Sequence, residues 1–154
     1  MANINGTSGN DLLNGTTSDD LIKGLAGDDV LYGNGGSDTL SGGSDNDTLN
    51  ANASSGNNIL KGGSGDDDLD VTFSSGNNIL KGGAGEDSLS VDFSSGKNLL
   101  FGGVGNDNLF ATNTKGNNTR ANASKLFLIT TKVKNQRKNQ DFALDYFLSS
   151  KAIA

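Results

Sequence analysis

The chain has 154 residues, which is the size of one domain or of a short repeat array. It contains 23 glycines and no Pro, Cys, Trp or His, and 32% of its residues are hydrophobic. Without Cys and His there can be no disulfide, no thiolate or imidazole metal ligand, no cysteine nucleophile and no Ser-His-Asp triad. Any bound metal must therefore be held by oxygen atoms.

The formal net charge of −6 is unevenly distributed along the chain. Residues 1–119 carry 16 acidic and 5 basic side chains (net −11), whereas residues 120–154 carry 2 acidic and 7 basic ones (net +5). The acidic part argues against nucleic-acid binding. No apolar run approaches the roughly 18 residues of a membrane span, and residues 1–5 lack the basic and apolar segments of a signal peptide. We expect neither a transmembrane segment nor a cleaved N-terminal signal.

Internal repeats occupy most of the chain. Residues 6–50 form five nine-residue units, each with Gly first, Asp sixth and Leu or Ile eighth: GTSGNDLLN, GTTSDDLIK, GLAGDDVLY, GNGGSDTLS and GGSDNDTLN. From residue 51 an eleven-residue unit (ANASSGNNILK, VTFSSGNNILK, VDFSSGKNLLF, ATNTKGNNTRA) alternates with a nine-residue one (GGSGDDDLD, GGAGEDSLS, GGVGNDNLF) until about residue 121. Such regularity excludes a disordered chain as the first interpretation, despite the low apolar content.

Each nine-residue unit predicts a six-residue loop followed by a three-residue strand, with two units making one coil of a solenoid. The eighth-position side chains then stack in two ladders: Leu13, Leu31, Leu49, Leu69, Leu89 and Leu109, and Ile22, Leu40, Leu60, Leu80 and Leu100. The eleven-residue units are predicted to add two strand residues, so that Val71 and Phe73 point inward, as do Val91 and Phe93. The predicted fold is all-β, a parallel β-roll whose later coils have the wider core.

The sixth-position residues define two edges of this roll. The aspartate edge carries Asp11, Asp29, Asp47, Asp67, Asp87 and Asp107, and the asparagine edge carries Asp20, Asp38, Asn58, Asn78, Asn98 and Asn118. Carboxylates stacked about 4.8 Å apart repel by roughly 3–4 kcal/mol per neighbouring pair at an effective dielectric near 20. A cation between the loops removes that repulsion, and glycines let backbone carbonyls turn toward it. An all-oxygen shell of this kind suits Ca²⁺ better than Mg²⁺.

The units GGSGDDDLD, GGAGEDSLS and GGVGNDNLF resemble the glycine-rich nonapeptide of the RTX (repeats-in-toxin) family, and the resemblance covers residues 6–110. It implies a parallel β-roll that binds several Ca²⁺ ions between successive coils, and type I export with folding outside the cell. The ligands that it implies are the carboxylates of Asp11, Asp20, Asp29, Asp38, Asp47, Asp67, Asp87 and Asp107, and the backbone carbonyls of Gly24, Gly42, Gly62, Gly65, Gly82, Gly85, Gly102 and Gly105. We expect up to about six ions.

Some units depart from the family pattern. The first two lack the second glycine, and the second also lacks the fourth; Asp45 replaces the fourth glycine of its loop. The best matches are the loops at 62–67, 82–87 and 102–107. In the eleven-residue units Asn stands at the Asp position, and stacked amides can hydrogen-bond along a ladder. We therefore expect the asparagine edge to be free of calcium from Asn58 onward.

Catalysis is not expected. The run Asp66-Asp67-Asp68 lies in a calcium loop and not in an apolar cleft that would raise one pKa for acid catalysis. An EF-hand, a P-loop and a dinucleotide-binding fingerprint are all absent from the sequence.

The last 33 residues follow different rules. They contain no glycine, and Arg120, just before them, stands where the ladder predicts Leu. Residues 126–129 read as a strand and residues 139–152 as an amphipathic helix. We therefore divide the chain into a repeat array (1–121) and a C-terminal α/β tail (122–154). The tail has three interpretations: a cap over the open end of the roll, an uncleaved export signal as in the RTX family, or a truncated or frame-shifted gene end.

The function predicted from the sequence is that of a secreted, extracellular, non-enzymatic calcium-binding protein whose β-roll folds on binding Ca²⁺. Two alternatives stay open. One is an adhesion or ligand-binding module that presents its Ser/Thr/Asn edge to a polysaccharide or cell surface. The other is a detached fragment of a larger toxin or secreted enzyme.

Overall fold

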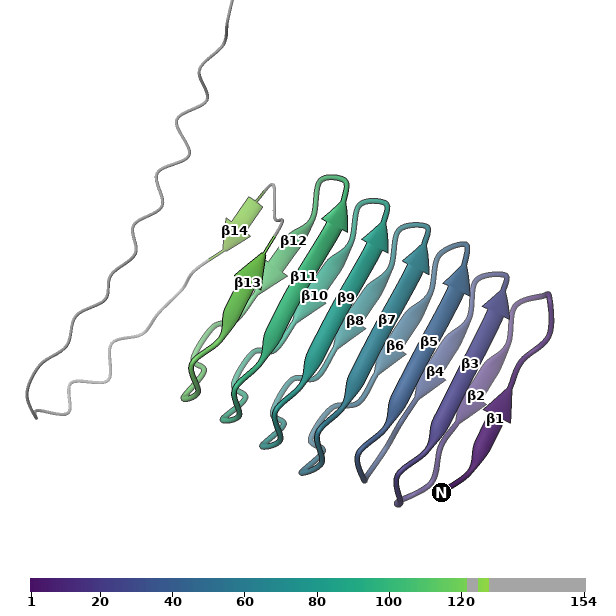
Figure 1. Cartoon of the computed structure of the whole chain (residues 1–154), viewed down its shortest axis with the longest axis horizontal. Helices are drawn as coiled ribbons and strands as arrows, with labels where there is room; N and C mark the ends of the chain where they lie inside the picture. The colour runs from purple at the N-terminus through teal and green to yellow at the C-terminus, as the bar shows by residue number, and fades with distance from the viewer. Residues whose placement is uncertain (122–124, 128–154) are drawn as a thin grey trace, which may run out of the picture.

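A computed structural model describes residues 1–121 and 125–127. Within them the strands form two seven-stranded parallel sheets. Sheet A consists of β1 (Asn3–Asn5), β3 (Leu21–Ala26), β5 (Thr39–Ser44), β7 (Ile59–Ser64), β9 (Ile79–Ala84), β11 (Leu99–Val104) and β13 (Thr119–Ala121). Sheet B consists of β2 (Leu12–Asn14), β4 (Val30–Tyr32), β6 (Thr48–Asn50), β8 (Asp68–Asp70), β10 (Ser88–Ser90), β12 (Asn108–Phe110) and β14 (Lys125–Phe127). Because successive strands alternate between the sheets, the chain winds as a parallel β-solenoid (Figure 1), which confirms the predicted all-β roll.

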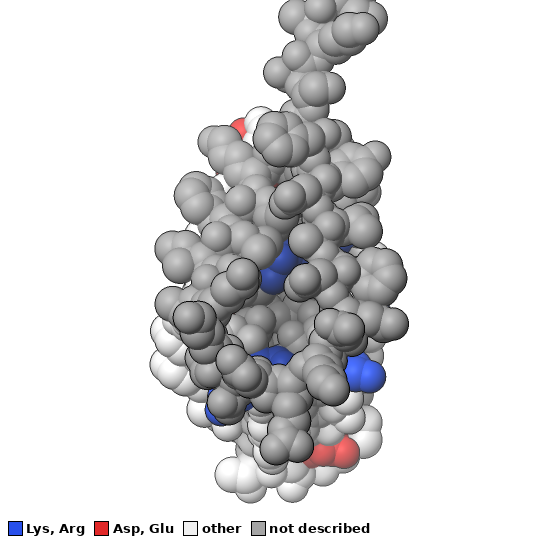
Figure 2. Space-filling model, turned by 90° about the vertical axis from the view of Figure 1, so that its left-hand side faces the viewer, with Lys and Arg blue, Asp and Glu red and all other residues white. Residues whose placement is uncertain are grey.

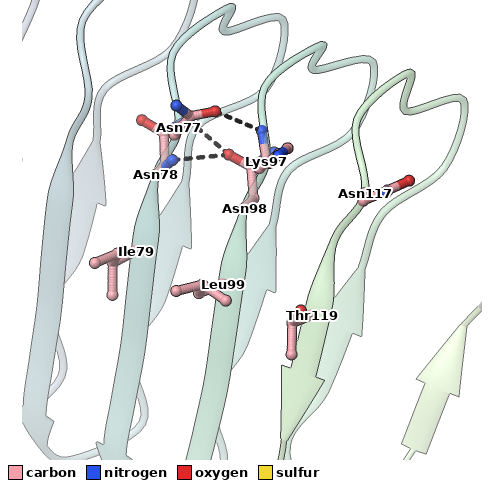
Figure 3. A pocket seen from close by; sticks show the side chains of 8 residues that line it. All are labelled: Asn77, Asn78, Ile79, Lys97, Asn98, Leu99, Asn117 and Thr119. Atoms are coloured by element: carbon pink, nitrogen blue, oxygen red, sulfur yellow. Dashed lines mark hydrogen bonds between the residues drawn. The ribbon is translucent and has the colours of Figure 1, made fainter.

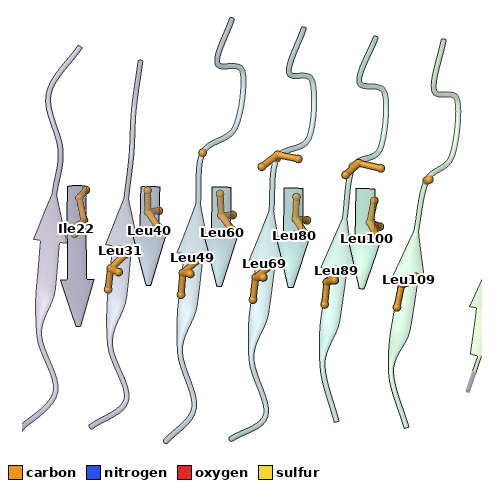
Figure 4. Packing of buried hydrophobic residues seen from close by; sticks show 14 residues of the cluster. Ile22, Leu31, Leu40, Leu49, Leu60, Leu69, Leu80, Leu89, Leu100 and Leu109 are labelled. Carbon is orange, nitrogen blue, oxygen red and sulfur yellow. The ribbon is translucent and has the colours of Figure 1, made fainter. Parts of the chain in front are cut away.

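The core consists of the two predicted ladders (Figure 4). Eighth-position residues of neighbouring coils are in register, as for Leu69 with Leu89 in sheet B and Leu60 with Leu80 in sheet A. All of these side chains from Ile22 to Leu109 are fully buried, whereas Leu13, near the open N-terminal end, is partly buried. A fully buried Leu or Ile contributes roughly 1.5–3 kcal/mol. The ladders are therefore the main apolar contribution to the fold.

The strands of sheet A are longer than predicted. From β3 to β11 they run for six residues, through the first three positions of the following nine-residue unit, and leave three-residue loops such as 65–67. The second-position glycines lie within these strands, with Gly63 paired to Gly83 at φ values of 134° and 133°. Glycine accepts this conformation without a steric cost. The predicted six-residue loop is therefore wrong for these units, although residues 15–20 and 33–38 do form six-residue connections.

The two extra residues of the eleven-residue units form a turn and not a strand extension. Val71 and Val91 are buried as predicted, but Phe73 is 65% exposed and Phe93 49% exposed, so their predicted inward orientation is wrong. At φ values of 59° and 57° the backbone leaves the extended region, which ends the strand alternation. The two rings stack on the surface with centroids 5.0 Å apart. The later coils do gain a wider core, through Ala51, Val71, Val91 and Ala111.

The ladders change character at the C-terminal end of the roll. Arg120 of β13 pairs with Leu100, and its Nε is buried without a hydrogen-bond partner. Burial lowers the pKa of the Arg120 guanidinium, and the charge of Asp92 partly opposes this. Sheet B continues into β14, whose backbone pairs Leu126 with Leu109. Figure 2 shows this end of the roll, with basic side chains visible near its middle and both acidic and basic side chains at its rim.

The predicted helix at 139–152 lies outside the described residues, as does most of the predicted tail, so the division at residue 121 stays a prediction. In the part of the chain that is described, no helix has the length and apolarity of a membrane span.

Candidate metal centre

The aspartates of the aspartate edge lie at the point where the chain turns from sheet A into sheet B, whereas Asp20 and Asp38 lie where it turns from sheet B into sheet A. From Asp29 onward a three-residue turn separates the two strands of the aspartate edge, and its last residue is the aspartate. Although carboxylates favour water, Asp67 and Asp47 are each 2% exposed, and Asp87 is fully buried. Burial of a charged group is costly unless it is paired or hydrogen-bonded. The partners of each carboxylate oxygen therefore decide what the site can bind.

One oxygen of each carboxylate is held by the backbone of the preceding coil. The Asp47 amide donates to Asp67 Oδ1 at 2.9 Å, and the Asp67 amide donates to Asp87 Oδ1 at 3.0 Å. The same bond links every pair from Asp11 to Asp107 along the edge. These bonds fix the carboxylates in one orientation and tie each coil to the next.

The second oxygen has no partner at six aspartates. Oδ2 is buried and makes no hydrogen bond at Asp29, Asp38, Asp47, Asp67, Asp87 and Asp107. Leaving a buried charged acceptor unsatisfied costs more than the ~1–3 kcal/mol of a neutral group. A row of such oxygens is the arrangement that a bound cation would satisfy, and carboxylate oxygens are ligands that Ca²⁺ prefers.

Glycine at the first repeat position leaves space beside these oxygens. A Cβ on Gly82 would collide with Asp87 Oδ2 and would lie 2.5 Å from the carbonyl oxygen of Gly102 in the next coil. At Gly24 the equivalent atoms are Asp29 Oδ2 and, at 2.9 Å, the carbonyl oxygen of Gly42. A carboxylate oxygen and a carbonyl oxygen of adjacent coils thus converge where a side chain is missing.

Backbone oxygens are needed to complete any such site. Among the described residues no group of three or more acidic side chains is placed to hold one ion. The convergent oxygens include the predicted ligand carbonyls of Gly24, Gly42 and Gly102. The carbonyls of Gly65 and Gly85 instead lie against the α-carbons of Gly85 and Gly105 in the next coil.

The first aspartate on each edge differs from the rest. Asp11 Oδ2 accepts hydrogen bonds from the Thr7 amide at 2.6 Å and the Thr7 hydroxyl at 2.9 Å. Asp20 Oδ2 accepts the same two bonds from Thr16, at 2.6 and 2.8 Å. The backbone donors Ala2 and Thr16 hold the pKa of Asp20 below its usual value, against the effect of burial. Threonine at the second position therefore supplies the partners that the later aspartates lack.

Burial shifts the acidity of the later carboxylates. It raises the pKa of Asp67 to about 7 and those of Asp38 and Asp47 to about 6, while a backbone donor opposes the shift and neighbouring carboxylates add to it. The pKa of Asp87 is raised for the same reasons. The charged form of these carboxylates is thus disfavoured in the absence of a cation.

The asparagine edge carries the predicted amide ladder (Figure 3). Asn78 Nδ2 donates to Asn98 Oδ1 at 2.9 Å, and the bonds from Asn58 to Asn78 and from Asn98 to Asn118 are 3.1 Å. Ser74 Oγ accepts a further bond from Asn78 Nδ2. These amide oxygens are all satisfied within the protein, in contrast to Oδ2 of the aspartates, and the prediction of an amide ladder is confirmed.

A further ladder at the fifth repeat position was not predicted. The Asp66 amide donates to Asn46 Oδ1, and the Glu86 amide donates to Asp66 Oδ1, both at 2.7 Å. The sequence carries a signal for it, because the fifth position of these units is always a residue with a side-chain acceptor. The ladder orders the loop tips. The acidic side chains there accept hydrogen bonds from backbone amides and do not belong to the row of buried Oδ2 atoms.

Comparison with known families gives a match to the RTX calcium-binding nonapeptide repeat (four copies) at residues 5–40, 14–49, 32–55, 50–71, 74–92 and 94–113. These segments together cover more than half of the chain. The chain belongs to this RTX repeat family. No curated protein and no solved structure matches it. The RTX match spans both kinds of unit, including the eleven-residue units that carry Asn at the sixth position.

Proposed function

We propose that this RTX chain binds Ca²⁺ between successive coils of the aspartate edge and that these ions order the roll. The observation that carries the proposal is the row of buried Oδ2 atoms without partners. The protein ligands would be the carboxylates of Asp29, Asp47, Asp67, Asp87 and Asp107, with first-position glycine carbonyls of the next coil. A bound ion would supply positive charge at this edge and would accept these oxygen atoms as ligands.

The sites are not expected to be equal. Asp38 would hold an ion on the opposite edge, because its Oδ2 also lacks a partner. Asp11 and Asp20 would be the weakest ligands, since Thr7 and Thr16 already satisfy their carboxylates. Six ions would carry a charge of about +12, close to the −11 of the 16 acidic and 5 basic side chains in residues 1–119. Filling the sites would therefore remove most of the self-repulsion of this segment.

Calcium concentration would then act as a folding switch. Extracellular calcium modules bind with Kd values of ~10⁻⁴–10⁻³ M, so the sites would be empty in a cell and filled outside it. A site filled at tenfold Kd contributes about 1.4 kcal/mol, and several together rival the stability of a small domain. RTX repeats are typical of secreted proteins, which supports export of the unfolded chain through a type I pathway and folding outside the cell.

Far-ultraviolet circular dichroism of the metal-stripped full chain, titrated with Ca²⁺, tests the switch. We expect β-sheet signal to appear cooperatively at submillimolar to millimolar Ca²⁺ and not with Mg²⁺ at the same ionic strength. A β-sheet content that is the same with and without Ca²⁺ would refute folding on binding.

A further inference from the structure

The outer face of sheet A differs in charge from the rest of the roll. Its strands contain no Asp or Glu, although residues 1–119 carry 16 acidic side chains. They do contain three lysines in one outward-facing column, in which Lys61 and Lys81 are adjacent and Lys23 lies two coils away. Phe101 follows Lys81 in the same column. This face is therefore the basic side of an acidic molecule.

The remaining lysines of residues 1–119 lie beside the same face. Lys97 and Lys115 belong to the loops that lead into β11 and β13. Those loops, at 91–98 and 111–118, contain one acid, Asp92. All five lysines thus gather along sheet A and the asparagine edge, away from the carboxylates of the aspartate edge. Such segregation favours an anionic partner on this side alone.

Two adjoining grooves lie on this face, over β9, β11 and the start of β13. One has a volume of about 460 Å³ and is lined by Asn77, Lys97, Leu99 and Thr119 among others (Figure 3). The other, of about 320 Å³, lies between Lys81 and Phe101, where Gly83 and Gly103 leave the backbone bare. Leu99 and Phe101 are each 37% exposed. The grooves therefore combine apolar surface, amide groups and lysine in one strip.

We propose that this strip binds a linear anionic polysaccharide of the polyuronate class, lying across the strands along the axis of the roll. The apolar faces of sugar rings would pack on Phe101 and Leu99 over the bare glycine backbone. Exposed amides such as Asn117 would hydrogen-bond ring hydroxyls. Lys61, Lys81 and Lys97, spaced by coils about 4.8 Å apart, would pair with carboxylates.

The charge of this face favours a polyuronate over two other partners, double-stranded DNA and a second copy of this chain. Double-stranded DNA carries one charge per about 1.7 Å, and five lysines on a chain of net −6 cannot match it. A second copy of this chain, packed face to face, would bring the Lys61 and Lys81 columns together. A polymer with one carboxylate per sugar carries fewer charges per unit length than DNA, so it needs fewer lysines, and its hydroxyls can hydrogen-bond the amides.

Binding is measured by isothermal titration calorimetry with the full chain at saturating Ca²⁺, where circular dichroism first shows that each variant is folded. The probe is a short oligogalacturonide that does not gel, and the control probe is its neutral methyl ester. We expect the acid to bind, the ester not to bind, and affinity to fall with salt. The double variant Lys61→Gln/Lys81→Gln should weaken binding about tenfold, equivalent to about 1.4 kcal/mol.

Matched variants separate the strip from the rest of the surface. Phe101→Ser should weaken binding about fivefold, and it should fold because Ser41 holds the same register position. Phe73→Ala removes a ring outside the strip that is 65% exposed, against 37% for Phe101, and should bind like the parent.

Four results would overturn the proposal: a folded parent that does not bind the acid, equal binding of the ester, equal binding of a single-stranded DNA oligomer, or lysine variants that bind unchanged. Since folding is monitored separately, none of these results bears on the calcium proposal.

Discussion

Replacing Asp67 by Asn should have opposite effects with and without calcium. Asn is the residue that the roll itself uses at this position on the other edge, so the change is compatible with the backbone. The carboxyl has a pKa of about 7 in the folded chain and 3.8 as its reference value. At pH 8 the folded chain is thus penalised by up to about 4 kcal/mol, at 1.36 kcal/mol per pKa unit, which Asn relieves. We expect the free energy of folding without calcium to be about 3 kcal/mol more favourable for the variant than for the parent, so that a larger fraction of the metal-free variant is folded.

Calcium should reverse this difference. Asp67 borders two gaps between coils, one toward Asp47 and one toward Asp87. Each lost site costs about 1.4 kcal/mol for every tenfold excess of calcium over Kd. The variant should therefore equal the parent near tenfold Kd and fall about 2 kcal/mol below it near a hundredfold excess.

The assay is urea unfolding at a series of fixed calcium concentrations, followed by circular dichroism. Asp28→Asn is the matched control, because Asp28 lies at a loop tip two coils away on the same edge and Asn46 holds the same position in the next coil. Its effect should not depend on calcium. A stability difference for Asp67→Asn that stays constant from the lowest calcium concentration at which both chains fold up to saturating calcium would refute the assignment of Asp67 as a ligand.

The remaining predictions probe other parts of the account. Gly82→Ala should place a methyl group on the Asp87 carboxylate and lower the number of bound ions by one in calorimetry; an unchanged stoichiometry would argue against the oxygen cradle. Asn78→Asp should break the amide ladder and lower stability by about 1–3 kcal/mol or more in urea unfolding at saturating calcium, and an unchanged stability would contradict a stabilising role of the ladder. For the metal-stripped chain, a carboxyl pKa raised from 3.8 to about 7 in the folded state gives stability that is complete below pH 3.8 and is lost as pH rises toward 7, so the β-sheet signal in circular dichroism should be stronger at pH 5 than at pH 8. Phe73→Ala should cost at most about 1 kcal/mol, because its ring is 65% exposed; a loss in the range of about 3–5 kcal/mol would indicate a core residue.

The architecture could be predicted because one apolar residue recurs at a fixed position. Leu at the eighth place of each unit leaves one way to bury an apolar side chain per half-coil, so the register of Leu69 with Leu89 follows. Period-2 alternation failed at Phe73 because it assumes an extended backbone, and a φ of 59° ends the strand there. The sequence does indicate that this position is exposed, because Asn113 occupies it in the last eleven-residue unit and a position that accepts Asn is not a core position.

The residues of the site could be predicted from the sequence, but the hydrogen-bond partners of their carboxylate oxygens could not. Repeat spacing is enough to place the aspartates in a row. The repeat spacing does not predict that Thr7 hydrogen-bonds Asp11 Oδ2 while Asp67 Oδ2 has no hydrogen-bond partner. This difference depends on the backbone path, which is a six-residue connection ending at Asp11 and a three-residue turn ending at Asp67. The substitution of Thr for the second glycine was visible in the sequence, but its hydroxyl and amide bonds needed coordinates.

A crystal structure of the calcium-loaded chain, with anomalous scattering used to locate the ions, tests the central claim most directly. We expect anomalous peaks between successive loops of the aspartate edge, within about 2.3–2.6 Å of Oδ2 atoms such as that of Asp67, and none between the Asn58, Asn78 and Asn98 loops. Peaks between the asparagine loops, or an aspartate edge without peaks at saturating calcium, would contradict it.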